Sequence, residues 1–272
     1  MTRETFEAGI AYEGERLDKY LNLIFSETDA AQSRSFFQKL IKEGHVLVND
    51  TAQKANYRLK ADDMICVEIP DAVQTPILPE NIPLDILYED DDLLVVNKPK
   101  GMVVHPSAGH YTGTLANALV HRYGGNFHAR FINRLDRNTS GVVLVAKNAL
   151  SAGALSGAMA AGNMQKTYFA VVEGELQSPG RIDADIRRKP DSIMLRETCP
   201  KGEGDASLTL FEPVFADREY TLLRLTPKTG RTHQLRVHLA SIGHPILGDE
   251  LYGMGSALIS RQALHAAALS FP

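Results

Sequence analysis

The stretch that most constrains the fold runs from residue 133 to residue 146 and reads NRLDRNTSGVVLVA. Its second part, Val142–Ala146, is an uninterrupted apolar segment with the length and β-branched content of a buried strand. Its first part, 133–141, is polar and ends in glycine, which indicates a loop held in place by that strand. The loop carries Asp136 between two arginines. A carboxylate in this setting is either a reactive group or half of an Arg–Asp ion pair that stabilises a turn.

Further strands and helices surround this loop in an irregular order, from about residue 84 to the C-terminus. Apolar or alternating segments predict strands at 93–97, 142–146, 168–173 and 220–226. Helical spacing of apolar residues predicts helices at 114–123, 149–162 and 232–242. Because strands outnumber helices and do not alternate with them, we predict an α+β domain built on a mixed, mostly antiparallel sheet.

A smaller unit precedes this domain. Apolar residues at helical spacing predict a helix at 16–25, and a second helix that follows a Ser33 N-cap and ends at Gly44. Short strands are expected at 46–48 and 64–69. Two helices and a few short strands make a domain with only a small core.

Prolines separate the two units. Pro76, Pro79 and Pro83 lie within the segment 71–83, where they oppose a continuous helix or a central strand. This segment is therefore predicted to be a linker. The boundaries predicted from the sequence are an N-terminal extension at 1–12, a small domain at 13–70, the linker at 71–83 and a large domain at 84–272.

The composition favours a soluble, cytoplasmic, globular protein. Apolar residues make up 44% of the 272 residues, which is enough for a sizeable core. The sequence has no apolar run long enough for a membrane span and no signal-peptide core at its polar N-terminus. Cys66 and Cys199 are far apart and are expected to be reduced structural thiols. No His, Cys and carboxylate residues share metal-ligand spacing, so we expect no metal.

Positive charge is concentrated in two segments, although the formal net charge of the chain is -4. The basic residues of the first segment are Arg34, Lys39, Lys42, Lys54, Arg58 and Lys60, and those of the second are Arg218, Arg224, Lys228, Arg231 and Arg236. Because Lys and Arg neutralise nucleic-acid phosphates, two basic segments in an acidic chain indicate a two-part nucleic-acid surface. Ordinary solvated surfaces would give the same pattern of charge.

Five segments of the large domain carry ordered sequence motifs. They are Val95–Gly101 with Val104–Pro106, Asn133–Gly141 with the strand that follows, Lys166–Ala170, Thr229–His238 and Gly243–Asp249. Together they resemble the RluA-type pseudouridine synthase family, and five ordered motifs agree by chance far less often than one does. In the small domain, Arg16–Leu21, Ser33–Arg34, Lys39–Ile41 and Gly44–Asn49 resemble the alpha-L (S-four type) RNA-binding domain.

This resemblance implies an isomerase that converts uridine to pseudouridine in structured RNA, and it implies roles for individual residues. By resemblance, Asp136 is the catalytic carboxylate, Tyr168 packs against the target base and Arg236 forms an ion pair with the aspartate. Arg134 is expected to fill the space in the duplex that the extracted nucleotide leaves. Many family members have histidine where this chain has Asn133, a difference that should leave activity intact but change local contacts with RNA.

The other expected site residues contact RNA or support the pocket. Those expected to bind RNA are Arg34, Lys39, Lys42, Arg134, Lys228 and Arg231, and those expected to support the pocket are Asn133, Leu135 and Leu235. The reaction moves the bond between ribose and uracil from nitrogen to carbon without gain or loss of atoms, so no cofactor is expected. A carboxylate can stabilise the positive charge that forms on the sugar, and an aromatic face can stack on a flipped base.

Some alternatives stay open at the level of sequence. Large-subunit ribosomal RNA is the favoured substrate, because an added RNA-binding domain suits a bulky structured target, and transfer RNA is the alternative. A non-catalytic RNA-binding or ribosome-assembly protein would have no need to keep Asp136, Tyr168 and Arg236 together. A metal-dependent nuclease would need clustered ligands that the sequence lacks. We expect a monomer that acts on RNA and does not bind a membrane.

Overall fold

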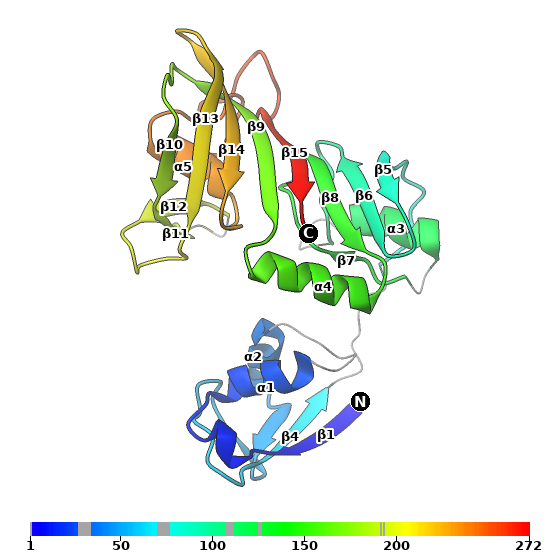
Figure 1. Ribbon diagram of the computed structural model, residues 1–272. Helices are drawn as coiled ribbons and strands as arrows, with labels where there is room; N and C mark the ends of the chain where they lie inside the picture. Colours follow the sequence, from blue (N-terminus) through cyan, green and yellow to red (C-terminus); the bar gives the residue numbers. More distant parts are fainter. Residues whose placement is uncertain are drawn as a thin grey trace. The chain divides into compact units, whose positions relative to one another are not determined.

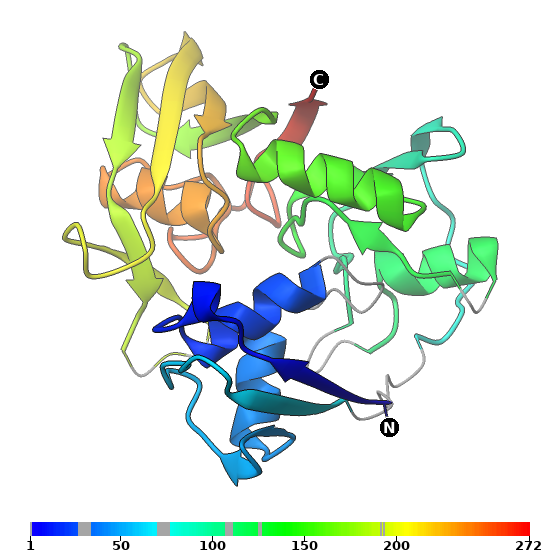
Figure 2. The ribbon, with the colours of Figure 1, turned by 60° about the horizontal axis from the view of Figure 1, so that its bottom comes forward.

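The computed structural model describes residues 2–26, 34–69, 77–106, 111–124, 127–190, 192 and 194–272. The chain forms two compact units, which comprise residues 1–76 and 77–272. Figures 1 and 2 show these units from two sides. The predicted N-cap, Ser33, lies outside the described residues.

In the small unit, two helices pack against a four-stranded antiparallel sheet. The helices are α1 (Leu17–Ser26) and α2 (Arg34–Lys42), and a short 3-10 helix, η1, spans Ile10–Tyr12. The strands are β1 (Thr2–Glu7), β2 (Val46–Val48), β3 (Thr51–Ala52) and β4 (Met64–Ile69), in the order β1-β4-β2-β3. The apolar sides of both helices share one core with β2 and β4, to which Leu21, Phe37, Val46 and Val67 contribute.

Strand β1 corrects the expectation of an N-terminal extension at 1–12. It is an edge strand that pairs with β4 along its length, beginning with Thr2 opposite Ile69. Phe6 packs against the core of the small unit. The other residues of β1 are charged or hydroxylic, which suits the edge of a sheet but hides the strand from a search for alternating apolar residues.

The predicted linker at 71–83 overlaps the large unit from residue 77 onward. The side-chain amide of Asn117 donates to the carbonyl oxygen of Leu78 at 2.8 Å. Ile82 packs against the core of the large unit. The second half of the predicted linker is therefore attached to the large unit rather than free of it.

In the large unit, the described residues form one nine-stranded mixed sheet and one separate hairpin. The strands of the sheet are β5 (Ile86–Glu89), β6 (Leu93–Lys98), β7 (Arg130–Phe131), β8 (Ser140–Ala146), β9 (Gln165–Glu173), β10 (Gly180–Asp183), β13 (Leu208–Ala216), β14 (Tyr220–Pro227) and β15 (Leu264–Ser270). Their order is β10-β13-β14-β9-β15-β8-β6-β5, with β7 also pairing with β8. Among these pairs, β15 and β8 are parallel and the others are antiparallel. The predicted sheet type is confirmed.

Helices cover both faces of this sheet (Figure 1). They are α3 (Leu115–Tyr123), α4 (Ala149–Ala160) and α5 (Gln234–Ser241). α3 and α5 contribute to the main core together with Val143 and Val145 of β8. α4 contributes Leu155 to a second core, with Leu144 and Ala146 of the same strand. Because successive strand residues point to opposite faces, β8 is buried on both sides, which explains its uninterrupted apolar sequence.

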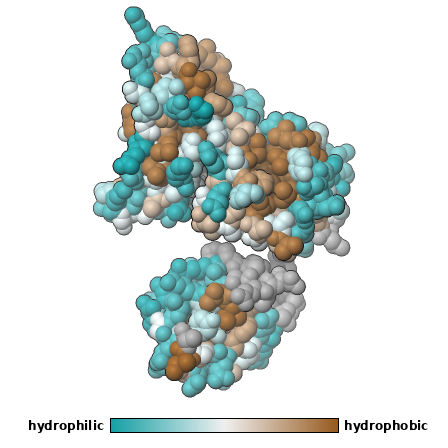
Figure 3. Space-filling model, viewed as in Figure 1, coloured by the Kyte–Doolittle hydropathy of each residue, from teal (hydrophilic) through white to brown (hydrophobic). Residues whose placement is uncertain are grey.

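The second face of the sheet is only partly covered. Leu93, Val95 and Leu269 pack against the second core but stay partly exposed. On the side shown in Figure 3, hydrophobic residues gather over this part of the large unit, whereas hydrophilic residues cover most of the small unit.

Several elements differ from the sequence-based expectation for local reasons. Strands β5, β7, β10 and β13, and the hairpin strands β11 (Asp185–Arg188) and β12 (Arg196–Cys199), were not predicted. Most of them are short or polar, and β13 contains Pro213 at an irregularity in its pairing with β14. Helix α5 begins at Gln234 rather than Thr232, because His233 adopts a left-handed conformation with φ of 59°.

Gly141 is the point at which the parallel pair of β8 and β15 closes. Its φ is +119°, a conformation that residues with a side chain rarely adopt. It lies opposite Ala266, and a Cβ atom at residue 141 would stand 2.1 Å from the Ala266 carbonyl oxygen. Only glycine lets β15 approach β8 this closely, directly after the loop that carries Asp136.

Substitution Gly141→Ala should therefore destabilise the large unit by more than about 3 kcal/mol, since both the backbone angle and the packing are incompatible with a side chain. Thermal and urea unfolding would measure this loss. Gly153→Ala is the matched control: Gly153 lies in α4, where an added Cβ atom would have no neighbouring atom within 4 Å, and this variant should gain about 0.5–1 kcal/mol. Equal stability of the two variants would contradict the proposed role of Gly141.

Candidate active site

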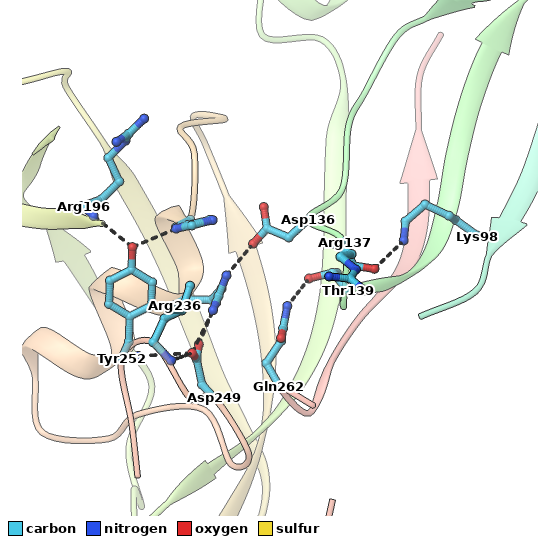
Figure 4. A network of polar contacts seen from close by, with 11 residues as sticks. Lys98, Asp136, Arg137, Thr139, Arg196, Arg236, Asp249, Tyr252 and Gln262 are labelled. Carbon is cyan, nitrogen blue, oxygen red and sulfur yellow. Dashed lines mark hydrogen bonds and ion pairs between the residues drawn. The ribbon is translucent and has the colours of Figure 1, made fainter. Parts of the chain in front are cut away.

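The loop between β7 and β8 places Asp136 at a cavity of about 290 Å³, whose lining also includes His233, Arg236 and Gln262. The Asp136 side chain is 27% exposed. A group in this position is held by the protein on one side and is open to a ligand on the other. Figure 4 shows the polar contacts around Asp136 and Arg236.

Lys98 fixes the loop that carries Asp136. Its ammonium group is buried and donates to the carbonyl oxygens of Pro99, Met102 and Arg137 at 2.9, 2.8 and 3.2 Å. Burial lowers the pKa of Lys98 to about 8, and the negative charge of Asp136 partly opposes this shift. The sequence suggested only that Lys98 ends a strand. In the structure, its side chain links β6 to the backbone of Arg137, the residue after Asp136.

Two side-chain amides hold the same loop from other directions. Gln262 Nε2 donates to Thr139 Oγ1 at 3.2 Å. Asn133 Nδ2 donates to the carbonyl oxygen of Val142 at 2.9 Å, and Asn133 Oδ1 accepts from the N–H of Leu144 at 2.8 Å. Asn133 is buried, so its amide bonds to the backbone of β8, and the expected effect on contacts with RNA finds no support in its position.

Arg236, on α5, joins Asp136 to a second aspartate. Arg236 Nη1 lies 3.2 Å from Asp136 Oδ2, while Nε and Nη2 donate to Asp249 at 2.6 and 2.8 Å. Asp249 is fully buried and also accepts from the backbone N–H groups of Leu251 and Tyr252 at 2.9 and 3.2 Å. Burial lowers the pKa of Arg236, but the bonds to Asp249 and Asp136 raise it by more. The pKa of Arg236 therefore lies above its usual value, and the guanidinium stays charged.

Tyr252 packs under Arg236 and extends the network to the hairpin. The Arg236 guanidinium lies 5.1 Å from the centre of the Tyr252 ring. The Tyr252 hydroxyl accepts from the backbone N–H of Arg196 at 2.9 Å and lies 2.8 Å from His233 Nδ1. The planar guanidinium is thus held at its edge by a carboxylate and at its face by an aromatic ring.

Tyr168 lies on β9 and is buried. Burial and the nearby charge of Asp136 raise the pKa of Tyr168 to about 12. The phenol is therefore neutral at physiological pH, and its hydroxyl can donate a hydrogen bond. Tyr168 is thus close enough to Asp136 for the carboxylate to affect its pKa. Its strand, β9, is separated from β8 by β15.

The other predicted residues fall into three groups. Arg134 and Arg231 line a second cavity of about 250 Å³ in the large unit, and Lys228 is exposed just after β14. Leu135 and Leu235 are buried members of the main core, which supports the loop and α5 from below. Arg34, Lys39 and Lys42 lie on α2 of the small unit.

Arg34 has a structural partner that the sequence did not indicate. It donates to the fully buried carboxylate of Asp18 at 2.8 Å, and Arg16 and Gln38 donate to the same carboxylate. Although burial opposes the shift, these bonds hold the pKa of Asp18 well below its usual range. Arg34 is therefore partly used to join α1 to α2, whereas Lys39 has 70% of its side chain exposed.

Two classes of site find no counterpart among the residues that the structure describes. No group of three or more His, Cys, Asp or Glu side chains there is arranged to hold a metal ion. No helix in the same part of the chain has the length and apolar character needed to cross a membrane.

Comparison with known proteins gives the class. Residues 92–241 match the family model of RNA pseudouridylate synthase, and residues 15–65 match that of the S4 domain. The chain belongs to the RNA pseudouridine synthase family, as the resemblance of its motifs predicted, and it carries an S4 domain at its N-terminal side.

Individual relatives are similar over nearly the whole chain. An uncharacterized RNA pseudouridine synthase of Bacillus subtilis, YlyB, is 39% identical over 266 residues, which cover 94% of this chain and 86% of the relative. Ribosomal large subunit pseudouridine synthase D of Xylella fastidiosa is 38% identical, with 95% and 81% covered. The solved structure of human RNA pseudouridylate synthase domain containing 1 is 30% identical, covers 75% of this chain and 82% of its own, and has a TM-score of 0.57.

Sequence reasoning missed three polar residues that organise the site, namely Lys98, Asp249 and Tyr252. Lys98 and Asp249 both fall within the motifs that carried the resemblance, and Tyr252 comes three residues after the last of them. In the sequence, Lys98 comes directly after an apolar strand and Asp249 lies in a turn that contains glycines. Charged residues in such positions are usually exposed to solvent. Here both charged groups are buried and paired.

Substitution Asp249→Asn should lower kcat by about 10- to 100-fold, because Arg236 loses its charged anchor and no longer presents Nη1 to Asp136 in a fixed geometry. Pseudouridine formation under single-turnover conditions would measure the change, and circular dichroism would verify folding. Glu250→Gln, which removes an exposed carboxylate from the same cavity, should have a much smaller effect. A folded Asp249→Asn protein with normal kcat would refute this role.

The pKa of Lys98 gives a second prediction. Below about pH 8 the ammonium donates to three carbonyl oxygens, and above it the neutral amine has one proton fewer. The activity of the wild-type protein should fall as pH rises through about 8. Lys98→Met should be slower at neutral pH and should lack this decline. Measuring kcat against pH with one RNA substrate tests the idea, and identical alkaline limbs in both proteins would exclude Lys98 as their source.

Proposed function

We propose that this protein converts specific uridines of large-subunit ribosomal RNA to pseudouridine, with Asp136 as the catalytic carboxylate. The observation that carries the proposal is the clamped ion pair: Arg236, fixed by Asp249, holds Asp136 at the rim of an open cavity. Family membership supports the reaction. The S4 domain and the names of relatives such as ribosomal large subunit pseudouridine synthase D support the ribosomal substrate.

The proposed chemistry starts with the bond between ribose and the uracil nitrogen. When this bond breaks, positive charge develops on the sugar, and the carboxylate of Asp136 stabilises it. Arg236, through Nη1, holds the carboxylate of Asp136 in a fixed orientation during this step. Because Asp249 is buried and both of its oxygens face Arg236, it does not act as a second acid, which distinguishes the site from a pair of carboxylates that would direct water to the sugar.

Tyr168 is proposed to pack against the displaced uracil. Its ring belongs to a rigid strand in the centre of the sheet, so its position is fixed before RNA binds. A target base inside a folded RNA must leave its stack to reach such a site, and an aromatic face compensates part of the lost stacking. The high pKa of Tyr168 keeps its hydroxyl protonated, so it can donate to a uracil oxygen.

The small unit is proposed to add affinity for structured RNA. Lys39 and Lys42 are exposed on α2, and Arg34 keeps 43% of its side chain exposed while it binds Asp18. Lysines on an exposed helix surface suit phosphate groups, which give affinity without reading sequence. We expect the protein to act on its RNA as a monomer in the cytoplasm, without a cofactor.

The test uses ribosomal RNA labelled with tritium at carbon 5 of uracil, because that tritium must leave when carbon 5 becomes the new glycosidic atom. The wild-type protein should release tritium without added metal or cofactor. Asp136→Asn should fold normally and lose at least about 10⁴-fold in rate, since it keeps the size of the side chain but not its charge.

Three substrates separate the outcomes. Release from naked large-subunit RNA or from pre-ribosomal particles would support the ribosomal assignment, and release from transfer RNA alone would replace it. Comparable activity of Asp136→Asn and wild type would reject Asp136 as the catalytic group. Absence of release from all three substrates would reject the proposed reaction for this chain.

A further inference from the structure

The second cavity of the large unit, about 250 Å³ in volume, is lined by five arginines. They come from four separate segments: Arg134 lies in the loop of Asp136, Arg187 and Arg188 lie on β11, Arg196 lies on β12, and Arg231 precedes α5. Asp205 is the one acidic residue in this lining. We refer to this cavity as the arginine cavity.

One of these arginines is neutralised by the protein itself. Arg187 forms ion pairs with Glu197 and Glu203, each at 2.8 Å. The other four have no such partner in the described part of the chain. The guanidinium groups of Arg196 and Arg231 donate to backbone carbonyl oxygens, those of Leu195 and Ala206, at 3.3 Å each. Four guanidinium groups thus face one carboxylate, so the cavity carries excess positive charge.

Two of the four occupy opposed positions on the hairpin. Arg188 and Arg196 are directly opposite each other in the antiparallel pairing of β11 with β12. Side chains at opposed positions point to the same face, and like charges there destabilise a hairpin. A separate two-stranded hairpin has little stability to spare. This pair opposes folding, and a bound anion would remove the conflict.

The cavity is tied to the active site by backbone and ring contacts. The N–H of Arg196 donates to the Tyr252 hydroxyl at 2.9 Å, and the Tyr252 ring lies under Arg236. Arg134 is two residues from Asp136. In Figure 4, Arg196 lies beyond Tyr252 at one end of the network that contains Asp136. An anion in the arginine cavity would therefore lie close to the reacting nucleotide.

We propose that the arginine cavity binds backbone phosphates of the RNA strand that carries the target uridine, and that the facing arginines Arg188 and Arg196 form its centre. The proposal rests on the proposed function only for the identity of the RNA. Guanidinium groups bind phosphate oxygens through paired hydrogen bonds, and phosphate contacts fix the register of a nucleic acid on a protein.

The first experiment measures RNA affinity at several salt concentrations for Arg188→Gln, Arg196→Gln and the double variant. Each lost phosphate contact should reduce the slope of log K against log salt by about 0.7–0.9, so the double variant should lose about 1.5. Arg122→Gln is the control, because Arg122 is exposed on α3, belongs to neither basic segment and is already paired with Glu89. Equal loss of slope in the control would overturn the proposal.

The second experiment measures melting temperature, because the proposal ties affinity to an unfavourable charge pair. Without RNA, Arg188→Gln should melt at the same temperature as wild type or higher, whereas a purely structural arginine would lower it. Added pyrophosphate should raise the melting temperature of the wild type, compete with RNA, and have no effect on the double variant.

These outcomes distinguish RNA phosphate from a free anion as the ligand of the arginine cavity. They also distinguish failure of the arginine-cavity proposal from failure of the proposed isomerase function. Stabilisation by pyrophosphate with an unchanged salt slope for RNA in the double variant would assign the cavity to a free anion and overturn the proposal. Binding is measured in the Asp136→Asn background as well, so that failure of the isomerase assignment leaves the slope test intact. A normal slope in the double variant, with Asp136→Asn inactive, would refute only the arginine cavity.

Discussion

The geometry of the site depends on the buried pair formed by Arg236 and Asp249. A buried guanidinium is costly unless it is fully bonded, and Asp249 accepts from two of its nitrogens, Nε and Nη2, while two backbone N–H groups donate to the same carboxylate. The third nitrogen of Arg236, Nη1, faces Asp136. Because Asp136 is partly exposed, its own pair with Arg236 is weak enough for a ligand to compete with it. The strong pair fixes the geometry, and the weaker pair is available for chemistry.

The fold supplies this geometry by converging distant segments on one short loop. β8 is buried on both faces, so it cannot shift without disturbing two cores. Gly141 lets β15 close against it, and Lys98 and Gln262 hold the loop from either side. Segments that are distant in the sequence thus meet around Asp136, and their contacts hold the loop in place despite its polar sequence.

The sequence predicted most of the backbone of the site but not its polar supports. Val142–Ala146 was recognisable because burial on both faces leaves a continuous apolar run. Asp136 and Arg236 were recognisable because they lie in ordered motifs. Asp249 and Lys98 were not, because the burial of a charged residue depends on a partner brought from elsewhere in the fold, which local pattern does not contain. The hairpin β11–β12 was not predicted for a related reason. Its strands are short and polar, and distant contacts such as that of Arg196 with Tyr252 stabilise them.

Local pairing also resolves the conflict between a net charge of -4 and a polyanionic substrate. Many carboxylates are committed to cations away from the cavities: Glu89 binds Arg122 and Lys147, and these bonds, with that of Tyr123, hold its pKa at about 2. Asp18 is likewise committed to Arg16 and Arg34. What RNA meets is the charge left over at each surface, and at the arginine cavity four guanidinium groups face Asp205. The distribution of paired and unpaired charge, rather than their sum, therefore determines where an anion can bind.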